Sequence, residues 1–477
     1  TTSNFTAAMT AAERDAYNAA FPNRVAIKHA HSQQNPERDW GALTLRAVDL
    51  ALYLLNEQFS QVVNGQRLNS FKADNVLVIA AGVGNGGGAA LAAGEQDTAG
   101  LIDGVVAAMP NIQMAVNNNV SVRRGSTTLT GTGRVLLDYM TLANQLQPCA
   151  ALASAVAAAP GAALVDATRG AARCAALKAQ GVLQASTTAA QADEALAQLQ
   201  AQGWQPESND LHASHAALSG AIALTYANAY GRFGVRDNLC GFSFAGVGSD
   251  FKPAALAGLP ATYGSFSGLA PSGGIEIINN NAVGGALENS RSVSATSGVA
   301  DYNADGARCL RNLFTATDAN AARVATGINE VRRTGNLRGK PAVIVHGRAD
   351  ALHPPSFTSR PYFALNKAVE GATSKLVYAE VTNAQHFDAF LGDASLAGLD
   401  TRFVPMLRYF NNAMDAVYNH LRSGTPLPPS QVVRTTPRGG TAGSATAIAV
   451  ANVPVINATP AAADQISFAS GLATIPE

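Results

Sequence analysis

The stretch NVLVIAAGVGNGGG, residues 75–88, joins a continuous apolar run to a cluster of glycines. An apolar run without alternation is typical of a strand that is buried on both faces at the centre of a parallel sheet. Residues 89–96, AALAAGEQ, continue as a small-residue segment that favours a helix. The sequence therefore predicts a strand, a sharp glycine-rich turn and a helix.

Strand and helix patterns alternate on both sides of this segment, and the alternation predicts an α/β fold around a mostly parallel sheet. Further strands are predicted at residues 25–31, 104–109, 341–346 and 375–381. Further helices are predicted at residues 43–59, 361–370 and 402–421. A long interruption of different composition separates the elements of the first half from those of the second.

The interruption covers residues 111–335 and is predicted to be mainly helical, since it is rich in alanine over residues 142–202. We expect residues 1–110 and 336–423 to form the two parts of one core, followed by a tail at 424–477. The insertion leaves the predicted sheet after a strand. At that place a lid would cover the carboxyl ends of the strands, where such sheets bind ligands.

The chain has 477 residues, with 33 basic and 33 acidic side chains and a formal net charge of zero. A balanced charge gives no electrostatic footprint for nucleic acid or for an anionic membrane, so neither is an expected partner. Hydrophobic residues make up 47% and charged residues 14%, which is typical of a well-buried globular chain. No apolar run approaches the roughly 20 residues that cross a bilayer, and residues 1–4 carry no targeting signal, so we expect a soluble chain.

The four cysteines form two local pairs, Cys149 with Cys174 and Cys240 with Cys309. None has the spacing of a CxxC motif or of a zinc finger. The pairs are therefore either buried free thiols or two disulfides, and we favour disulfides. Disulfides indicate an oxidising compartment, so the chain is expected to be secreted or periplasmic.

The glycine cluster fits two motifs, and the first is the dinucleotide fingerprint G-x-G-x-x-G at Gly82, Gly84 and Gly87. That motif places a pyrophosphate at the start of a helix and needs an acidic residue that ends the next strand. Asp103 has the required separation but precedes the next apolar run instead of following it. The pattern therefore argues against a nucleotide-dependent oxidoreductase.

The second motif is the nucleophile elbow G-x-S-x-G, in which a sharp strand-to-helix turn exposes one side chain over the sheet. Gly82 and Gly86 occupy the flanking positions, which must be small, and Gly84 occupies the central one. Glycine has no hydroxyl group to attack an ester. The chain as written therefore cannot form an acyl-enzyme through this turn.

An acid and a base follow the predicted elbow in the chain order of α/β hydrolases. Asp350 comes directly after the strand PAVIVH of residues 341–346, and His386 comes after the strand that ends at Val381. Each of these side chains thus lies in a loop at the carboxyl end of a predicted strand. The combination predicts a relay of position 84, His386 as general base and Asp350 as its orienting acid.

Five longer segments of the chain carry a more specific pattern, namely HAHSQQNPERDWG (29–41), GNGGGAALAAGEQD (84–97), DYNADGARCLR (301–311), HGRADALHPPS (346–356) and NAQHFDAF (383–390). Together these segments resemble one family, the D-(-)-3-hydroxybutyrate oligomer hydrolases. The resemblance implies an α/β-hydrolase-type serine esterase that cleaves short oligomers released from polyhydroxybutyrate. It also implies that a catalytic serine belongs at position 84, with Asp350 and His386 as its partners and a small-molecule ester as substrate.

The chain departs from this family in two respects. The first is Gly84, which implies an inactivated variant; with serine there, the backbone N–H of Asn85 would be one oxyanion donor. The second is the short segment before the elbow strand, where family members carry further sheet strands. We therefore expect that the N-terminal part of the sheet is missing from this chain, and that it has either been cut away or is supplied as a separate polypeptide that completes the core.

Two other functions stay open. One is a carboxylesterase similar to feruloyl esterases or tannases, which would need a pocket for an aromatic acid. The other is a non-catalytic binding protein for hydroxyacid oligomers.

One segment outside these motifs, DYNADG at residues 301–306, matches the opening of a calcium loop. Position twelve of that loop would be Asn312 instead of glutamate, and a solvated turn beside Cys309 explains the same residues. We therefore expect no metal site. The esterase interpretation also needs no cofactor.

Overall fold

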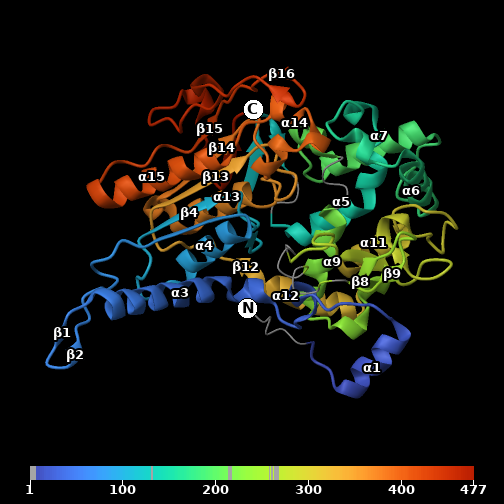
Figure 1. Cartoon of the computed structure of the whole chain (residues 1–477). Coiled ribbons are helices and arrows are strands. Elements are labelled where there is room, and N and C mark those ends of the chain that lie inside the picture. Colours follow the sequence, from blue (N-terminus) through green and yellow to red (C-terminus); the bar gives the residue numbers. More distant parts are fainter. Residues whose placement is uncertain (1–6, 130–132, 213–217, 257, 259–261, 263–267) are drawn as a thin grey trace. The chain divides into compact units, whose positions relative to one another are not determined.

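The structure is a computed structural model that describes residues 7–129, 133–212, 218–256, 258, 262 and 268–477 (Figure 1). It divides into two compact units. Unit 1 consists of Thr1–Pro36, Leu137–Gln202 and Asn209–Glu330, and unit 2 consists of Glu37–Leu136, Gly203–Ser208 and Val331–Glu477. The domain boundaries expected at residues 110, 335 and 423 stay predictions.

Unit 2 is built on a five-stranded sheet in which every neighbouring pair of strands is parallel (Figure 1). The strand order is β15 (Gln431–Val433), β14 (Leu376–Val381), β13 (Ala342–Gly347), β4 (Gly104–Ala108) and β3 (Ile79–Val83). Four of these strands lie in segments for which a strand is predicted. The expected α/β class and the mostly parallel sheet are confirmed.

Side chains of the sheet alternate between two buried faces. Val105 and Ala107 face one apolar cluster, to which helices α4 (Asn85–Gln96) and α13 (Ser359–Glu370) contribute. Val106 and Ala108 face the other cluster, which α15 (Leu407–Ser423) covers. All four side chains are inaccessible to solvent, and burying a valine contributes about 1.5–3 kcal/mol to folding. Because successive side chains of a strand point to opposite faces, both faces of the sheet are apolar and helices pack on each of them.

Strand β3 differs from its prediction in two respects. It begins at Ile79, later than predicted, and it forms the edge of the described sheet, with β4 as its only neighbour there. Leu77, just before the strand, is 44% exposed. The prediction of a central strand buried on both faces is therefore wrong for this chain, because within the described residues no strand pairs with the outer edge of β3.

Helix α3 runs from Pro36 to Phe59 and confirms the helix predicted at residues 43–59. Proline suits the first turn of a helix, since it lacks an N–H group that would have no partner there. Leu45 packs against the apolar cluster beneath α4. Several other apolar side chains of α3 are more than half exposed, namely Leu43, Leu50, Tyr53, Leu54 and Phe59.

The remaining elements of unit 2 are short. They are α14 (Leu399–Arg402), β1 (Val62–Val63), β2 (Gln66–Arg67), β5 (Gln113–Met114), β6 (Ser121–Arg124), β7 (Thr127–Thr128), β12 (Arg332–Arg333), β16 (Gly440–Thr441), β17 (Ser444–Ala445), β18 (Ser467–Ala469) and β19 (Leu472–Ile475). In the C-terminal tail, β19 pairs in parallel with β6, and Ala473 and Ile475 are fully buried. The tail therefore contributes both β15 and part of the core.

Unit 1 combines helices with a four-stranded antiparallel sheet of order β11-β10-β8-β9. Its helices are α1 (Ala11–Ala20), α2 (Lys28–His31), α5 (Leu136–Ala150), α6 (Ala167–Ala179), α7 (Thr188–Ala201), α9 (Leu218–Gly231), α11 (Ala304–Thr315) and α12 (Ala319–Val331). Its strands are β8 (Phe242–Val247), β9 (Pro253–Ala254), β10 (Glu276–Asn279) and β11 (Leu287–Glu288).

The strand predicted at residues 25–31 is wrong, because Lys28–His31 form the short helix α2. The buried His31 side chain folds back on this turn, since its Nδ1 accepts a hydrogen bond of 3.0 Å from the backbone N–H of Ile27. Burial lowers the pKa of His31 to about 4, which keeps the ring neutral and able to accept. Periodicity alone does not reveal a hydrogen bond between a side chain and the backbone of its own turn.

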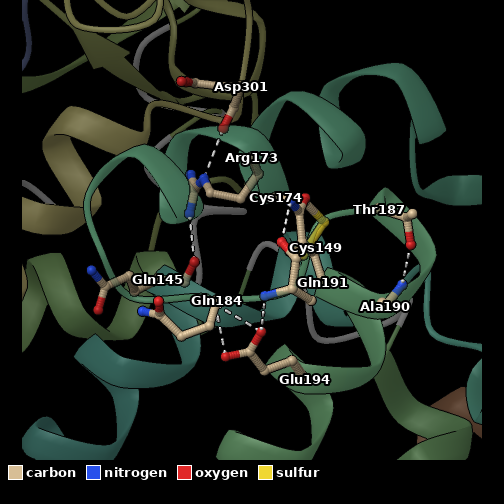
Figure 2. Close-up of a disulfide and its surroundings, with 11 residues drawn as sticks. Gln145, Cys149, Arg173, Cys174, Gln184, Thr187, Ala190, Gln191, Glu194 and Asp301 are labelled. Atoms are coloured by element: carbon tan, nitrogen blue, oxygen red, sulfur yellow. Dashed lines mark hydrogen bonds between the residues drawn. A yellow bond between two sulfur atoms is a disulfide. The ribbon is translucent and has the colours of Figure 1, made fainter.

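Both predicted disulfides are present in unit 1. Cys149 at the end of α5 is bonded to Cys174 in α6, and Cys240 before β8 is bonded to Cys309 in α11. Figure 2 shows the first of them beside the buried Arg173, whose Nε donates to the backbone carbonyl of Asp301 at 2.8 Å. The alternative of free thiols is thereby excluded.

The DYNADG segment forms the start of helix α11. Asn303 caps the helix, with its side-chain oxygen accepting from the N–H of Gly306. The Asp301 carboxylate accepts from the hydroxyls of Ser294 and Ser297 and from the N–H of Ala304. Helix capping thus accounts for the oxygen atoms that resembled a calcium loop. Among the described residues, no group of three or more His, Cys, Asp or Glu side chains could hold a metal ion.

None of the helices in the described part of the chain is long and apolar enough to cross a membrane.

Candidate active site

Four loops of unit 2 meet at the carboxyl end of its parallel sheet. They follow β3, β4, β13 and β14, and they bring Gly84, Met109, Asp350 and His386 to one place. In a parallel sheet the carboxyl ends of all strands lie at the same edge, which is where such sheets bind ligands. Three of these residues were predicted from sequence, and Met109 was not.

Gly84 occupies a sharp turn between β3 and α4, with φ of 57° and ψ of −121°. Its N–H donates to the carbonyl of Ala108 at 2.9 Å, and its carbonyl accepts from the N–H of Asn111 at 3.0 Å. A Cβ atom at Gly82 would overlap the backbone of Gly86, so only glycine fits there. The turn thus has the backbone of a nucleophile elbow, in a conformation that L side chains rarely adopt.

The Gly84 turn faces the imidazole of His386. A Cβ atom built on Gly84 would lie 3.4 Å from His386 Nε2, which is ordinary van der Waals contact. A hydroxyl on that Cβ would extend one bond further, into hydrogen-bond reach of the same nitrogen. The other ring nitrogen, Nδ1, lies 2.8 Å from Asp350 Oδ2. The structure therefore brings position 84, His386 and Asp350 together in the predicted order.

The carboxylate of Asp350 is fully buried and has several donors. Its Oδ1 accepts from the backbone N–H groups of Leu352 and His353, both at 2.8 Å. Burial, the largest single influence, favours a raised pKa. The charge and hydrogen bond of His386 and the hydrogen bond of His346 outweigh it, so the pKa of Asp350 lies well below its usual range. Asp350 is therefore ionised and can orient and stabilise a protonated His386.

A second imidazole contacts the same carboxylate and was missed by the sequence analysis. His346, at the end of β13, has no exposed surface, and its Nε2 lies 3.2 Å from Asp350 Oδ2. Its Nδ1 lies 2.6 Å from the hydroxyl of Ser359. Because an ionised carboxylate only accepts, it favours the proton on Nε2, and the Ser359 hydroxyl then donates to Nδ1.

A third imidazole, also missed, lies beside position 84. His353 packs edge-on against His386, with ring centroids 4.8 Å apart and planes at 88°. Its Nδ1 lies 3.0 Å from the carbonyl oxygen of Met109. Burial, together with the neighbouring His386, lowers the pKa of His353 to about 3, so its ring is neutral. The spacing H-x-x-x-D-x-x-H around Asp350 was the available signal for both additional histidines.

Asn85 is the first residue of α4 and directly follows Gly84. Its side-chain oxygen accepts from Asn111 Nδ2 at 3.0 Å, and Asn111 Oδ1 accepts from Gln113 Nε2 at 2.7 Å. These bonds hold the start of α4 against the loop after β4. The backbone N–H of Asn85 thus belongs to the positive end of a helix beside the turn.

The loops that carry the acid and the base are joined by a buried cluster of charged side chains. Glu380 in β14 accepts from Arg348 at 2.6 Å, from Arg360 at two distances of 2.7 Å and from the Tyr378 hydroxyl at 2.7 Å. Burial favours a raised pKa for Glu380, but Arg360 and Arg348 lower it well below its usual value. The cluster fixes β13 and β14, and thereby the spacing of Asp350 and His386.

Asp103, the candidate ribose-binding residue of a dinucleotide site, lies elsewhere. It directly precedes β4, and its carboxylate accepts from the N–H of Val78 at 2.8 Å. It therefore lies at the amino end of β4, whereas the Gly84 turn lies at the carboxyl ends of the strands. Asp103 thus precedes β4, in agreement with its place before the apolar run in the sequence.

The whole chain, residues 1–477, matches the family model described as 3HB-oligomer hydrolase (3HBOH). The chain is similar to the D-(-)-3-hydroxybutyrate oligomer hydrolases of Polaromonas naphthalenivorans (strain CJ2) and Albidiferax ferrireducens (strain ATCC BAA-621 / DSM 15236 / T118). It is 53% identical to each, over 99% of this chain and 68% of the relative. A relative from Ralstonia pickettii with the same name is 49% identical, over 99% of this chain and 65% of the relative. No solved structure matches the chain.

Proposed function

Because the chain belongs to the 3HB-oligomer hydrolase family, we propose that position 84, His386 and Asp350 are the catalytic centre of a serine-type carboxylester hydrolase. The substrates are dimers and short oligomers of 3-hydroxybutyrate, in keeping with the names of the relatives. The chain as written is inactive, because Gly84 replaces the nucleophile. The observation that carries the proposal is the 3.4 Å approach of a Cβ at position 84 to His386 Nε2, together with the 2.8 Å contact of His386 with Asp350.

With serine at position 84, the hydroxyl attacks the ester carbonyl while His386 Nε2 takes its proton. The protonated ring then returns the proton to the leaving alcohol oxygen, and the ester bond breaks. A water molecule, deprotonated by the same ring, hydrolyses the acyl-enzyme and frees 3-hydroxybutyrate. Asp350 holds the tautomer and stabilises the imidazolium. The N–H of Asn85 donates to the oxyanion, a contribution of about 3 kcal/mol to transition-state stabilisation.

The direct test is the Gly84→Ser form, assayed for release of monomer from the 3-hydroxybutyrate dimer. Gly84→Ala is the matched control, because alanine has the same backbone strain and lacks the hydroxyl. We expect turnover in the serine form and none in the alanine form or in the unchanged chain. Binding of the dimer without any turnover by the serine form would contradict the proposal and favour a non-catalytic binding protein.

We also propose that a further polypeptide segment pairs with the outer edge of β3 and covers α3. Within the described residues this edge is open, and the exposed apolar side chains of α3 lie in the same unit. An open edge beside exposed apolar groups is a typical site for strand addition. Native mass spectrometry of the protein isolated from its source tests this proposal. A co-purifying polypeptide, or a chain longer than residues 1–477, is expected; a monomer that consists of these residues alone contradicts the proposal.

Two further parts of the proposal concern the location of the protein and the insertion. The two disulfides support a secreted or periplasmic location, since such bonds persist in oxidising compartments. We propose in addition that residues 111–335 serve as the lid of the esterase. This segment follows β4 and precedes β13, two strands whose carboxyl ends carry the site. Deletion of residues 137–202 in the Gly84→Ser form is expected to raise the KM for the 3-hydroxybutyrate dimer, and an unchanged KM would contradict the proposed lid.

A further inference from the structure

His353 is the nearest polar side chain to position 84 that the proposed relay does not use. Its Cε1 atom lies 3.6 Å from a Cβ built at that position, almost as close as His386. The ring is held by the contact of Nδ1 with the Met109 carbonyl and by its packing against His386. It is buried, and only 5% of its surface is exposed. His353 is therefore a fixed part of the site wall.

The hydrogen-bonding role of His353 follows from its partner. A carbonyl oxygen can only accept, so the proton of the neutral ring is on Nδ1. The other nitrogen, Nε2, then has a lone pair and acts solely as an acceptor. Among the described residues, the only hydrogen bond of the ring is that of Nδ1 with Met109. Nε2 is bonded to Cε1, so this nitrogen is one bond from the ring atom nearest to position 84.

An acceptor at this place selects among the groups of the substrate. In an oligomer of a hydroxyacid, the ester oxygens and the terminal carboxylate only accept hydrogen bonds. The one donor is the free hydroxyl at the end of the oligomer. When the terminal unit is the acyl group at position 84, this hydroxyl lies two carbon atoms from the reacting carbonyl. It is thus within reach of a ring whose edge contacts the same position.

We propose that His353 is a specificity-determining residue whose Nε2 accepts a hydrogen bond from the free 3-hydroxyl of the acyl unit at position 84. The inference rests on the proposed function. The hydrogen bond from the 3-hydroxyl to His353 directs cleavage to the ester bond next to the hydroxyl end of the oligomer. Monomers are therefore removed from that end. Acyl groups without a 3-hydroxyl leave the Nε2 acceptor unsatisfied and react more slowly.

The test compares two esters of the same alcohol, a 3-hydroxybutyryl ester and a butyryl ester, in the Gly84→Ser form. We expect kcat/KM to favour the hydroxylated acyl group by about 10- to 100-fold. With His353→Phe added, which keeps a ring against His386 but has no acceptor, we expect the preference to fall to within about 3-fold. With His353→Gln, whose amide can donate to Met109 and present its oxygen, we expect part of the preference to return.

Two results would overturn the inference. One is an unchanged preference in the His353→Phe form. The other is an equal loss of both activities, which would assign His353 to the positioning of His386 alone.

A second measurement is independent of catalysis and uses the chain as it is. The ¹⁵N resonance of His353 Nε2 is followed while methyl 3-hydroxybutyrate or methyl butyrate is added to the Gly84 protein. We expect the resonance to move toward that of a hydrogen-bonded nitrogen with the hydroxylated ester only. Equal responses to both esters, or no response to either, contradict the role of His353. Inactivity of the Gly84→Ser form on both esters would instead contradict the proposed function, and the titration would still decide the role of His353.

Discussion

The turn after β3 and the loops after β13 and β14 meet in one site, but they differ in completeness. On the loop side, the Asp350 carboxylate is fully buried, accepts two backbone N–H groups and contacts two imidazoles. On the turn side, Gly84 has the backbone of an elbow and no side chain. The acid–base side is therefore held by its own contacts and persists without a nucleophile.

The largest effect is expected from Asp350→Asn in the Gly84→Ser form. Asparagine keeps the shape of the side chain but favours the wrong tautomer of His386, which lowers kcat by about 10⁴-fold in triads of this kind. Steady-state kinetics on the 3-hydroxybutyrate dimer measures the loss. A decrease of less than about tenfold would exclude Asp350 as the orienting acid.

Glu380→Gln tests whether the buried cluster of charged side chains fixes the loops after β13 and β14. Removing one charge leaves Arg348 and Arg360 buried without compensation, which destabilises proteins by about 3–5 kcal/mol. Urea unfolding measures the change in the free energy of unfolding. Arg434→Gln is the matched control, because its ion pair with Asp464 is 43% exposed on the arginine side, and such surface pairs contribute about 0–1 kcal/mol. Equal effects of the two substitutions would contradict a structural role for the buried cluster.

The turn side is tested by the stability of the Gly84→Ser form. A non-glycine residue at φ of 57° and ψ of −121° is strained, so we expect a loss of about 1–3 kcal/mol in the free energy of unfolding. Gly84→Ala should lose a similar amount, because the strain comes from the backbone and not from the hydroxyl. A serine form as stable as the unchanged chain would contradict the strained elbow.

The buried His353 makes stability depend on pH. Its pKa is lowered to about 3 in the folded protein by burial and by His386, whereas the unfolded value is about 6.5. As the pH falls below about 6.5, the unfolded state takes up a proton that the folded state does not, so stability decreases down to about pH 3. We expect the decrease between pH 7 and pH 5 to be smaller by about 2 kcal/mol in His353→Gln. Urea unfolding at pH 7 and at pH 5 measures the free energy of unfolding of both proteins. An equal decrease between the two pH values in both would contradict a neutral buried ring.

The smallest effect is expected from Ser359→Ala, which removes the donor to His346 Nδ1. One net hydrogen bond amounts to about 0.5–1.5 kcal/mol, so we expect kcat/KM of the Gly84→Ser form to fall about 2- to 10-fold. The acidic side of the pH–rate profile should also move, because the contact between His346 and Asp350 is altered. Ser374→Ala is the control, since its hydroxyl bonds Asn366 and touches none of these groups. An unchanged pH profile would give Ser359 a purely structural role.

Much of the core of unit 2 could be predicted from the sequence. The segments around β4, β13 and β14 are long apolar runs between glycines, prolines and polar residues, and these signals are local. Strand β15 was not predicted, because Gln431–Val433 is only three residues long in a proline-rich segment. Its place in the sheet depends on pairing with β14, a contact far away in the sequence.

The residues of the candidate site also divide into those that the sequence predicted and those that it did not. Gly84, Asp350 and His386 could be predicted because each follows a strand signal and their order along the chain fits a known arrangement. The spacing H-x-x-x-D-x-x-H places His346 and His353 near Asp350 in the sequence, but their roles and that of Ser359 could not be predicted, because these depend on which atoms the side chains face. His353, for example, is a site residue only because β4 places the Met109 carbonyl 3.0 Å from its Nδ1.

Periodicity and residue identity, which are properties of the chain, were enough to establish the α/β class and the absence of a hydroxyl at position 84, and the cysteine spacing favoured two disulfides over free thiols. The edge position of β3, the three imidazoles around Asp350 and position 84, and the buried glutamate that joins two arginines became visible only in three dimensions. Burial and hydrogen bonding depend on distances between atoms remote in sequence, which local patterns do not specify.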